Sequence, residues 1–346
     1  MEVDLNSVAY KKAVLITGGS IKVPENFKPP FRLSRSTAGP GAGHPSIVIG
    51  FKGTRVKKAI SNDKGEFELV GNVTPYKLLW KGKPFLEEVE IQPVLYHAPQ
   101  QAFFNLSQEC IYDCKFCNSP RLEKDYTKNL DPEKVIGMIL EASTRPDFKG
   151  VALTSAVPDD PHKTVMRMAY IISVVREKLG PEVPIGVEPY IDDFQDINRL
   201  KAAGADEIKI NIETFDQEIF KKVCGKMNFE HIVKAIKFAV SVFGRGNVCS
   251  NIIYGLGETD ENVIEGVEFL AKMGCVATLR ALKIDDRNRP ALEETLGLLE
   301  PVTPERMVKL AQEAENAFII YGMSPLKFKT MCHECTCCDL VPFKDL

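Results

Sequence analysis

The stretch that decides the fold is Cys110-Ile111-Tyr112-Asp113-Cys114-Lys115-Phe116-Cys117. Three thiols this close together can hold one face of an iron–sulfur cube. Three protein ligands for four irons leave one iron open to another molecule. No histidine lies within ten residues of this group, and zinc sites more often pair two Cys-x-x-Cys hooks or add histidines. A three-ligand zinc site, or three structural cysteines, is the alternative.

Around this motif the chain alternates between apolar strands and amphipathic helices. Helices are expected to begin at Asp131-Pro132 and at Thr303-Pro304, where a capping side chain precedes proline. Strands are expected at 102–106, 150–155, 184–189, 207–212, 248–255 and 276–284. This order predicts an α/β fold with a parallel sheet, a partial or full (β/α) barrel. The cysteines follow the first strand and therefore lie at the face where barrel active sites are found.

Residues 1–98 lack helical periodicity and predict a small β-rich N-terminal domain. The barrel is expected over residues 99–320 and a cysteine-rich tail over residues 321–346. The glycine-rich stretch at 39–43 matches neither a phosphate loop nor a dinucleotide fingerprint, so we interpret it as a loop.

Composition narrows the class of protein. The 346 residues carry a formal net charge of −3, which gives no electrostatic case for nucleic-acid binding. No apolar run is long enough for a membrane helix, and the acidic start lacks the order of a signal peptide, so a cytoplasmic location without membrane contact is expected. In a reducing compartment, ten cysteines suggest metal or redox chemistry.

A second group of cysteines lies in the tail, at Cys332, Cys335, Cys337 and Cys338. We expect these thiols to bind an auxiliary [4Fe–4S] cluster. Adjacent Cys337 and Cys338 would compete sterically, so not all four need bind it. Zinc bound by cysteines and His333, or a redox thiol or persulfide carrier, are the alternatives. Residues 323–331 could span about 30 Å when extended, which would let the tail lie over the barrel mouth.

Over residues 102–320 the chain resembles the radical S-adenosylmethionine (SAM) superfamily, in its biotin synthase and lipoyl synthase branch. The resemblance is carried by the cysteine motif together with three stretches: Asn211-Ile212-Glu213-Thr214, Val248-Cys249-Ser250 and Gly255-Leu256-Gly257-Glu258-Thr259. It implies that SAM binds the open iron through its amino and carboxylate groups. Electron transfer from the [4Fe–4S] cluster would then cleave SAM to a 5′-deoxyadenosyl radical, which abstracts hydrogen from an unactivated carbon.

The resemblance also implies which residues contact the cofactors. Cys110, Cys114 and Cys117 would hold the catalytic cluster. Leu153-Thr154-Ser155-Ala156 stands where the family has a Gly-Gly-Glu segment, so backbone carbonyls would carry that contact. The residues expected to contact SAM or the substrate are Phe116, Thr154, Ser155, Glu188, Asn211, Glu213, Tyr254, Gly255 and Arg280.

Two of these residues have a plain structural alternative. Arg280 is the only charge in an otherwise apolar or small strand, and inside a barrel it would partner the carboxylate of SAM or of an acidic substrate. On the surface it would be an ordinary strand-end arginine. Glu188 could equally be a solvated carboxylate at the start of a helix.

The leading functional hypothesis is sulfur insertion at unactivated C–H carbons of an acyl chain, free or bound to a carrier protein, with the tail cluster as sulfur donor. Residues 1–109 contain no cysteine, unlike bacterial lipoyl synthases. Cys249 resembles one cluster ligand of biotin synthases, but the strands before it carry none, and it could be a packed thiol. The arrangement is similar to archaeal two-component lipoyl synthases, which implies a reducing electron donor and a second radical SAM subunit as partners.

Two other functions compete with sulfur insertion. One is carbon-skeleton or metallocofactor-maturation chemistry, as in methylornithine synthase and the hydrogenase maturases, which have similar barrels. The other is a non-catalytic carrier of clusters. An open iron argues against that last alternative, because a scaffold does not need one.

Overall fold

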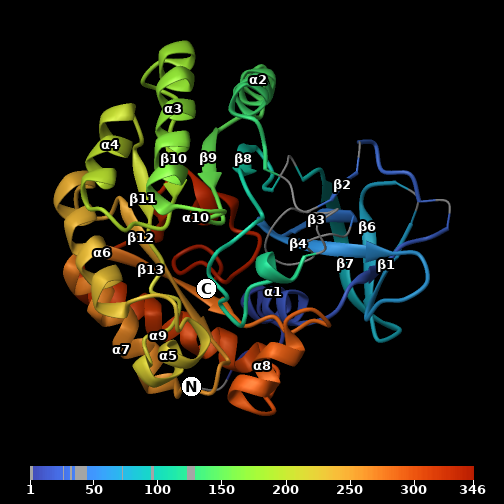
Figure 1. Ribbon diagram of the computed structural model, residues 1–346. Coiled ribbons are helices and arrows are strands. Elements are labelled where there is room, and N and C mark those ends of the chain that lie inside the picture. Colours follow the sequence, from blue (N-terminus) through green and yellow to red (C-terminus); the bar gives the residue numbers. More distant parts are fainter. Residues whose placement is uncertain are drawn as a thin grey trace.

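The computed structural model describes residues 3–25, 27–31, 33–35, 45–71, 73–94, 97–122 and 129–346. The expected loop at 39–43 lies outside them. Figure 1 shows a layered half with helices around a parallel sheet, a separate β-structure beside it, and the red C-terminal segment between the two. The tail therefore lies between these two halves and contacts both.

Six parallel strands form the central sheet, in the order β13-β12-β11-β10-β9-β8. They are β8 (Gln101–Asn105), β9 (Gly150–Thr154), β10 (Ile185–Glu188), β11 (Glu207–Lys209), β12 (Val248–Tyr254) and β13 (Cys275–Ala281). Each predicted strand therefore forms. Among the described residues no ladder joins β8 to β13, so the sheet is an open, partial barrel and not a closed one.

Helices alternate with the strands along the chain, and α3, α4, α6 and α7 lie on the outside of the sheet (Figure 1). They are α2 (Pro132–Ser143), α3 (Pro161–Leu179), α4 (Gln195–Ala203), α5 (Gln217–Val223), α6 (Phe229–Phe243), α7 (Asp260–Met273), α8 (Arg289–Leu296) and α9 (Pro304–Tyr321). As predicted, Asp131 and Thr303 cap α2 and α9, accepting from the N–H groups of Lys134 and Arg306. In the described part of the chain, no helix has both the length and the apolar character needed to cross a bilayer.

The N-terminal strands close into a small barrel of their own. They are β1 (Ile21–Lys22), β2 (Ser34–Arg35), β3 (Pro45–Phe51), β4 (Thr54–Ser61), β5 (Phe67–Val70), β6 (Tyr76–Trp80) and β7 (Lys83–Gln92). Their order is β2-β3-β4-β1-β5-β6-β7, and β7 also pairs with β3, which closes the ring. Among the described residues of this barrel, closure leaves the short β2 as the one added edge strand.

The described part of residues 1–98 is rich in strands, but it also contains the helix α1 (Val8–Thr17), which no sequence pattern indicated. Its residues Ala13, Val14, Leu15 and Ile16 are all buried. A helix with consecutive buried positions shows no amphipathic period, so the 3.6-residue pattern that sequence reasoning relies on is hidden. The helix packs against β4 and α9, and so joins the N-terminal barrel to the central sheet.

The tail forms η3 (Pro325–Lys327) and α10 (Met331–Cys335). Thr330 donates its backbone N–H (3.0 Å) and its hydroxyl to Glu207, the first residue of β11. Gln101, the first residue of β8, donates to the carbonyl of Met331 (3.1 Å). A Cβ at Gly186 would lie 2.0 Å from the Thr330 hydroxyl, so only glycine admits the tail. The tail thus enters at the N-terminal ends of the strands, and not over the barrel mouth, which its length would also have allowed.

Candidate active site

The motif cysteines lie in the loop that follows β8, at the C-terminal end of the sheet. The guanidinium of Arg121 donates to the carbonyls of Cys114 (3.0 Å) and Cys117 (2.6 Å). It also pairs with the Asp113 carboxylate (2.8 Å). One forked side chain therefore holds the backbone of the whole loop, a task suited to the planar donors of arginine.

Cys114 acts to raise the pKa of both Cys110 and Cys117, so the three thiols lie within electrostatic range of one another. Burial raises the pKa of Cys117 to about 11, and burial also raises the pKa of Cys110. The backbone N–H of Ser119 lies 3.4 Å from the Cys117 sulfur. Among the described residues, no three His, Cys, Asp or Glu side chains surround a point at which one ion could bind. A [4Fe–4S] cluster does not need one shared point, because each cysteine sulfur binds a different iron. The thiols of Cys110, Cys114 and Cys117 therefore fit such a cluster.

A fourth cysteine, which sequence reasoning left unassigned, lies beside the motif. The Cys114 sulfur is 3.5 Å from the thioether sulfur of Met227. The Cys114 thiol also neighbours Cys224 and raises the pKa of that buried thiol. The Lys115 N–H bonds to the Val223 carbonyl (2.9 Å), which anchors the two loops together. No spacing in the sequence could show this contact, because the partners are more than a hundred positions apart.

Charged side chains gather where β10 and β11 end. The Glu188 carboxylate lies 3.2 Å from the Lys209 ammonium and accepts from the Asn211 amide (2.9 Å). Burial acts to raise the pKa of Glu188, but Lys209 and these hydrogen bonds outweigh it and the pKa is lowered. Glu188 is therefore an interior anion and not a solvated one. Lys209 was missed, although a lysine in the buried strand Glu207–Lys209 was a visible signal.

Glu213 lies just beyond, with a left-handed backbone at φ 64°. Burial, followed by the charge of Glu188, raises the pKa of Glu213 to about 7. Within the described structure, Asn105 in β8, Asn251 in β12 and Thr214 after β11 have buried side-chain oxygens without a hydrogen-bond partner. Buried polar atoms normally find partners, so these atoms are suited to a polar ligand such as SAM.

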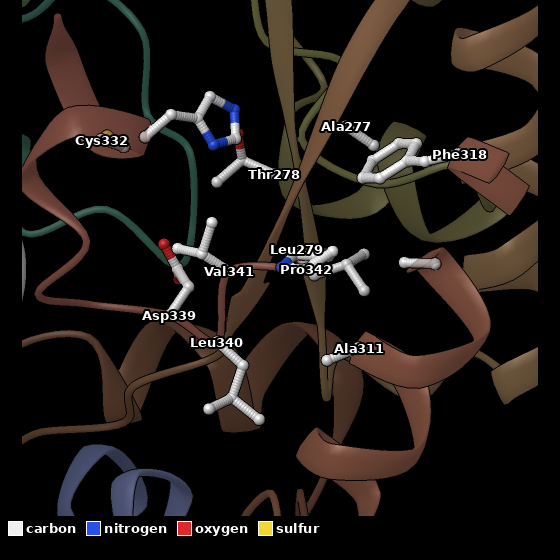
Figure 2. A pocket seen from close by; sticks show the side chains of 12 residues that line it. Ala277, Thr278, Leu279, Ala311, Phe318, Cys332, Asp339, Leu340, Val341 and Pro342 are labelled. Atoms are coloured by element: carbon white, nitrogen blue, oxygen red, sulfur yellow. The ribbon is translucent and has the colours of Figure 1, made fainter. Parts of the chain in front are cut away.

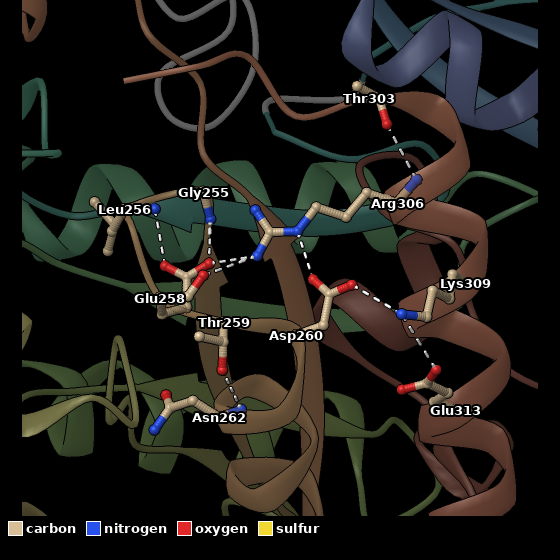
Figure 3. A network of polar contacts seen from close by, with 10 residues as sticks. All are labelled: Gly255, Leu256, Glu258, Thr259, Asp260, Asn262, Thr303, Arg306, Lys309 and Glu313. Atoms are coloured by element: carbon tan, nitrogen blue, oxygen red, sulfur yellow. Dashed lines mark hydrogen bonds and ion pairs between the residues drawn. The ribbon is translucent and has the colours of Figure 1, made fainter. Parts of the chain in front are cut away.

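The loop after β12 is held by one carboxylate (Figure 3). Glu258 accepts from the N–H groups of Gly255 (2.6 Å) and Leu256 (2.9 Å), and pairs with Arg306 (2.9 Å). Arg306 also lies 5.6 Å from the ring centre of buried Tyr254. Gly255 has φ 98°, a conformation that favours glycine. The Gly-Leu-Gly-Glu motif is thus a fixed turn with its backbone set by Glu258.

The other predicted contact residues are also placed by hydrogen bonds. Phe116 is half-buried and its carbonyl accepts from the Asn288 amide (3.0 Å). The Thr154 carbonyl accepts from the Leu106 N–H (2.8 Å), and the Ser155 hydroxyl donates to the Ala156 carbonyl (2.6 Å). The Thr154 and Ser155 segment follows β9, at the same end of the sheet as the cysteine loop.

Arg280 is an interior residue, and its partners come from the tail. Its guanidinium pairs with Asp339 (2.6 Å) and donates to the Cys332 sulfur (2.7 Å). Lys209 also donates to the Cys332 sulfur (3.3 Å). Figure 2 shows Cys332 and Asp339 on a small pocket between β13, α9 and the tail. The surface-arginine alternative is therefore excluded, and the Arg280 charge is shared between two tail side chains.

The remaining tail cysteines lie at the end of α10 and just beyond it. Cys335 and Cys337 are buried and Cys338 is half-buried. His333 instead directs its Nε2 atom toward the Thr278 hydroxyl (3.0 Å). Burial lowers the pKa of His333 to about 3, so the ring is neutral at neutral pH. Cys249 is buried in β12, near Cys275 and Cys332.

Comparison with known proteins identifies the class. Residues 104–270 match the family model described as the Radical SAM superfamily. This chain therefore carries a radical SAM domain, as the cysteine spacing predicted, and that family implies a [4Fe–4S] cluster and SAM.

The particular relatives are distant and differ in function. A lipoyl synthase from Caldanaerobacter subterraneus subsp. tengcongensis is 27% identical, over 59% of this chain and 69% of its own. A protein named as a probable GTP 3′,8-cyclase from Thermococcus kodakarensis is 26% identical, over 61% of this chain and 66% of its own. The crystal structure of methylornithine synthase (PylB) matches with a TM-score of 0.51 and 19% identity, over 64% of this chain and 68% of its own. That structure shares the fold.

Proposed function

We propose that this protein is a radical SAM enzyme whose Cys110, Cys114 and Cys117 hold a [4Fe–4S] cluster with one iron open to SAM. The observation that carries the proposal is the three thiols on one loop, fixed by Arg121, at the C-terminal end of a parallel sheet. When bound, the cluster supplies the electron that cleaves SAM reductively.

The chain's own residues would bind and orient SAM. The fixed turn at Gly255 and Leu256 presents backbone beside the strand ends, and Glu258 keeps it from moving. Asn211, Glu213 and the unpartnered oxygens of Asn105 and Thr214 offer polar contacts in a buried setting. Where these groups cover the cysteine loop, they would also exclude water from it. Exclusion of water protects reactive intermediates from side reactions.

We further propose that the reaction is sulfur insertion into an acyl C–H bond, with a tail cluster as sulfur donor. The resemblance to lipoyl synthases supports it, and so does the tail, which brings four cysteines to the centre of the molecule. Cys332 reaches the same interior as Glu188 and Lys209. Arg280 is close to both Cys332 and Cys338, so a cluster held by the tail cysteines would adjoin that interior.

A second candidate is carbon-skeleton or metallocofactor-maturation chemistry on a polar substrate. The observation that favours it is the charge of the interior. Lys209 pairs with Glu188, and both Lys209 and Arg280 donate hydrogen bonds to the Cys332 sulfur. An aliphatic chain bound against these charged groups would displace their water without providing hydrogen bonds in its place. Burying unpaired charge in this way costs free energy. A small substrate with its own carboxylate or ammonium group would match these charges.

Production of 5′-deoxyadenosine tests the class. Anaerobically reconstituted protein with SAM and dithionite should release it, whereas Cys114→Ala should not. Cys275→Ala is the matched control, because it removes a buried thiol outside both cysteine groups. Activity that survives Cys114→Ala would refute the assignment.

Mass spectrometry of an octanoylated peptide incubated with SAM and reductant separates the two candidates. Sulfur insertion predicts thiolated peptide and a loss of acid-labile sulfide from the protein after one turnover. Unchanged peptide and unchanged sulfide, with 5′-deoxyadenosine still formed, would favour the polar substrate.

A further inference from the structure

We propose that Cys335, Cys337 and Cys338 form the thiol set of a second iron–sulfur site, that strand β4 of the N-terminal barrel supplies its opposite wall, and that Cys332 lies outside it. The inference rests on the tail site proposed above. It divides the four tail cysteines into two groups and gives the N-terminal barrel a function.

The first observation is the turn that brings the thiols together. Thr336, between Cys335 and Cys337, has φ 55°, and its N–H closes α10 on the Cys332 carbonyl (2.7 Å). Beyond the turn, the Cys337 thiol donates to the Cys335 carbonyl (3.1 Å). A β-branched residue rarely adopts this left-handed conformation, and such strain persists only where the surroundings fix it. The reversal directs neighbouring thiols to one side of the chain.

The second observation is that the N-terminal part of the chain holds this turn. Lys12 in α1 donates to the Thr336 carbonyl (2.7 Å). Arg55 in β4 donates to the carbonyls of Glu334 (2.7 Å) and Cys335 (2.9 Å). The backbone N–H of Lys57, also in β4, donates to the Cys337 carbonyl (3.1 Å). Consecutive tail carbonyls are thus fixed from outside the tail, and the strained turn is secured by a different domain.

The third observation is the charge around the thiols. The Lys57 side chain is 2% exposed, its ammonium donates to the His97 carbonyl (3.3 Å), and its charge acts to lower the pKa of both Cys335 and Cys338. Arg280 interacts with Cys338 from the side of the sheet, and so does Lys283. Thiolates bound to a cube carry net negative charge, and buried negative charge needs nearby cations. The cations come from both domains, so the site exists only where the two meet.

Cys332 belongs to other surroundings. Its sulfur accepts from Arg280 (2.7 Å) and Lys209 (3.3 Å) on the interior of the parallel sheet. Cys335 and Cys337 instead lie near each other and near Arg55 of β4, with Lys57 of β4 also near Cys335. Arg280 acts on both Cys332 and Cys338, so the interior thiol and the three junction thiols adjoin at this guanidinium.

Iron content after anaerobic reconstitution with iron and sulfide tests the division. The full chain should hold about eight irons, two cubes' worth. Cys335→Ala, Cys337→Ala and Cys338→Ala should each hold about half of that, while Cys332→Ala keeps the full content. The iron on the first loop and an unchanged circular dichroism spectrum report that each variant is folded.

The β4 wall is tested by release of iron to a chelator. Lys57→Met keeps the backbone contact but removes the charge, so we expect release of the second-site iron to be at least about tenfold faster. Lys58→Met is the matched control, because Lys58 is buried on the same strand but donates to the Leu15 (2.5 Å) and Gly18 (2.8 Å) carbonyls instead. Lys58→Met should release iron at the wild-type rate.

Three results would overturn the inference: equal iron loss in Cys332→Ala and Cys335→Ala, equal release rates in the two lysine variants, or a wild-type tail that holds zinc or no metal. Formation of 5′-deoxyadenosine by the wild-type chain is measured in parallel. If it forms without a second iron site, the inference fails alone. If the iron pattern holds but SAM is not cleaved, the proposed function fails alone.

Discussion

Removing the Glu258 carboxylate should destabilise the fold far more than removing its exposed neighbours. The side chain is 1% exposed and is paired with an Arg306 side chain that is 25% exposed. Glu258→Ala leaves that arginine without one partner and leaves the N–H groups of Gly255 and Leu256 without an acceptor. Breaking a buried pair costs about 3–5 kcal/mol, and each buried unsatisfied donor about 1–3 kcal/mol. Because Arg306 retains Asp260, we expect a total loss of about 3–5 kcal/mol.

Urea denaturation followed by circular dichroism measures this loss through the shift of the midpoint. Lys309→Ala is the matched control from the same network (Figure 3). The Lys309 side chain is 51% exposed and binds Asp260 at 3.2 Å, so its removal should cost no more than about 1 kcal/mol. Glu258→Gln keeps an oxygen acceptor without the charge and should fall between the two. A loss below about 1 kcal/mol for Glu258→Ala would refute the reasoning.

Three further predictions follow from the site. Alanine at any one motif cysteine should abolish SAM cleavage while circular dichroism stays unchanged; a variant that still forms 5′-deoxyadenosine would contradict the cluster assignment. Arg280→Met should lower the free energy of unfolding by about 3–5 kcal/mol, because the Asp339 carboxylate, 7% exposed, loses its partner; the double variant with Asp339→Asn should recover part of that, and additive losses would show that the pair is not coupled. The pKa of Glu213 is raised to about 7 in the folded protein, so the folded state binds this proton more tightly than the unfolded state does. The free energy of unfolding should therefore fall as pH rises from about 4.5 to 7. Urea titrations across this range should show a decline, at most about 3 kcal/mol, that Glu213→Gln lacks; identical pH profiles would refute it.

Much of the parallel sheet could be predicted because its signals are local. Asp131 and Thr303 mark helix starts through their own side chains, and each buried strand is a short apolar run. The cysteine motif is local as well, since its ligands lie on one loop. Helix α1 could not be found, because with Ala13–Ile16 buried on successive positions it carries no amphipathic period.

The rest of the site could not be predicted because its contacts join distant parts of the chain. Cys332 meets Arg280 across 52 positions and Lys209 across 123. Lys12 meets Thr336 across 324 positions. A sequence pattern shows which residues bear charge or sulfur, but these pairings depend on where the tail enters the sheet. That entry is set by the space above Gly186 and the acceptor at Glu207, which only the folded chain defines.

The position of the tail has a consequence for how the molecule is assembled. Every strand of the sheet is synthesised before residues 330–345, which dock against the sheet. One of these late residues, Asp345, binds Lys12, which precedes it by 333 positions. Loop closure over such a separation is slow relative to local folding. In a chain made from its N-terminus, Arg280 and Lys209 are therefore synthesised before Asp339 and Cys332, the tail residues that they bind.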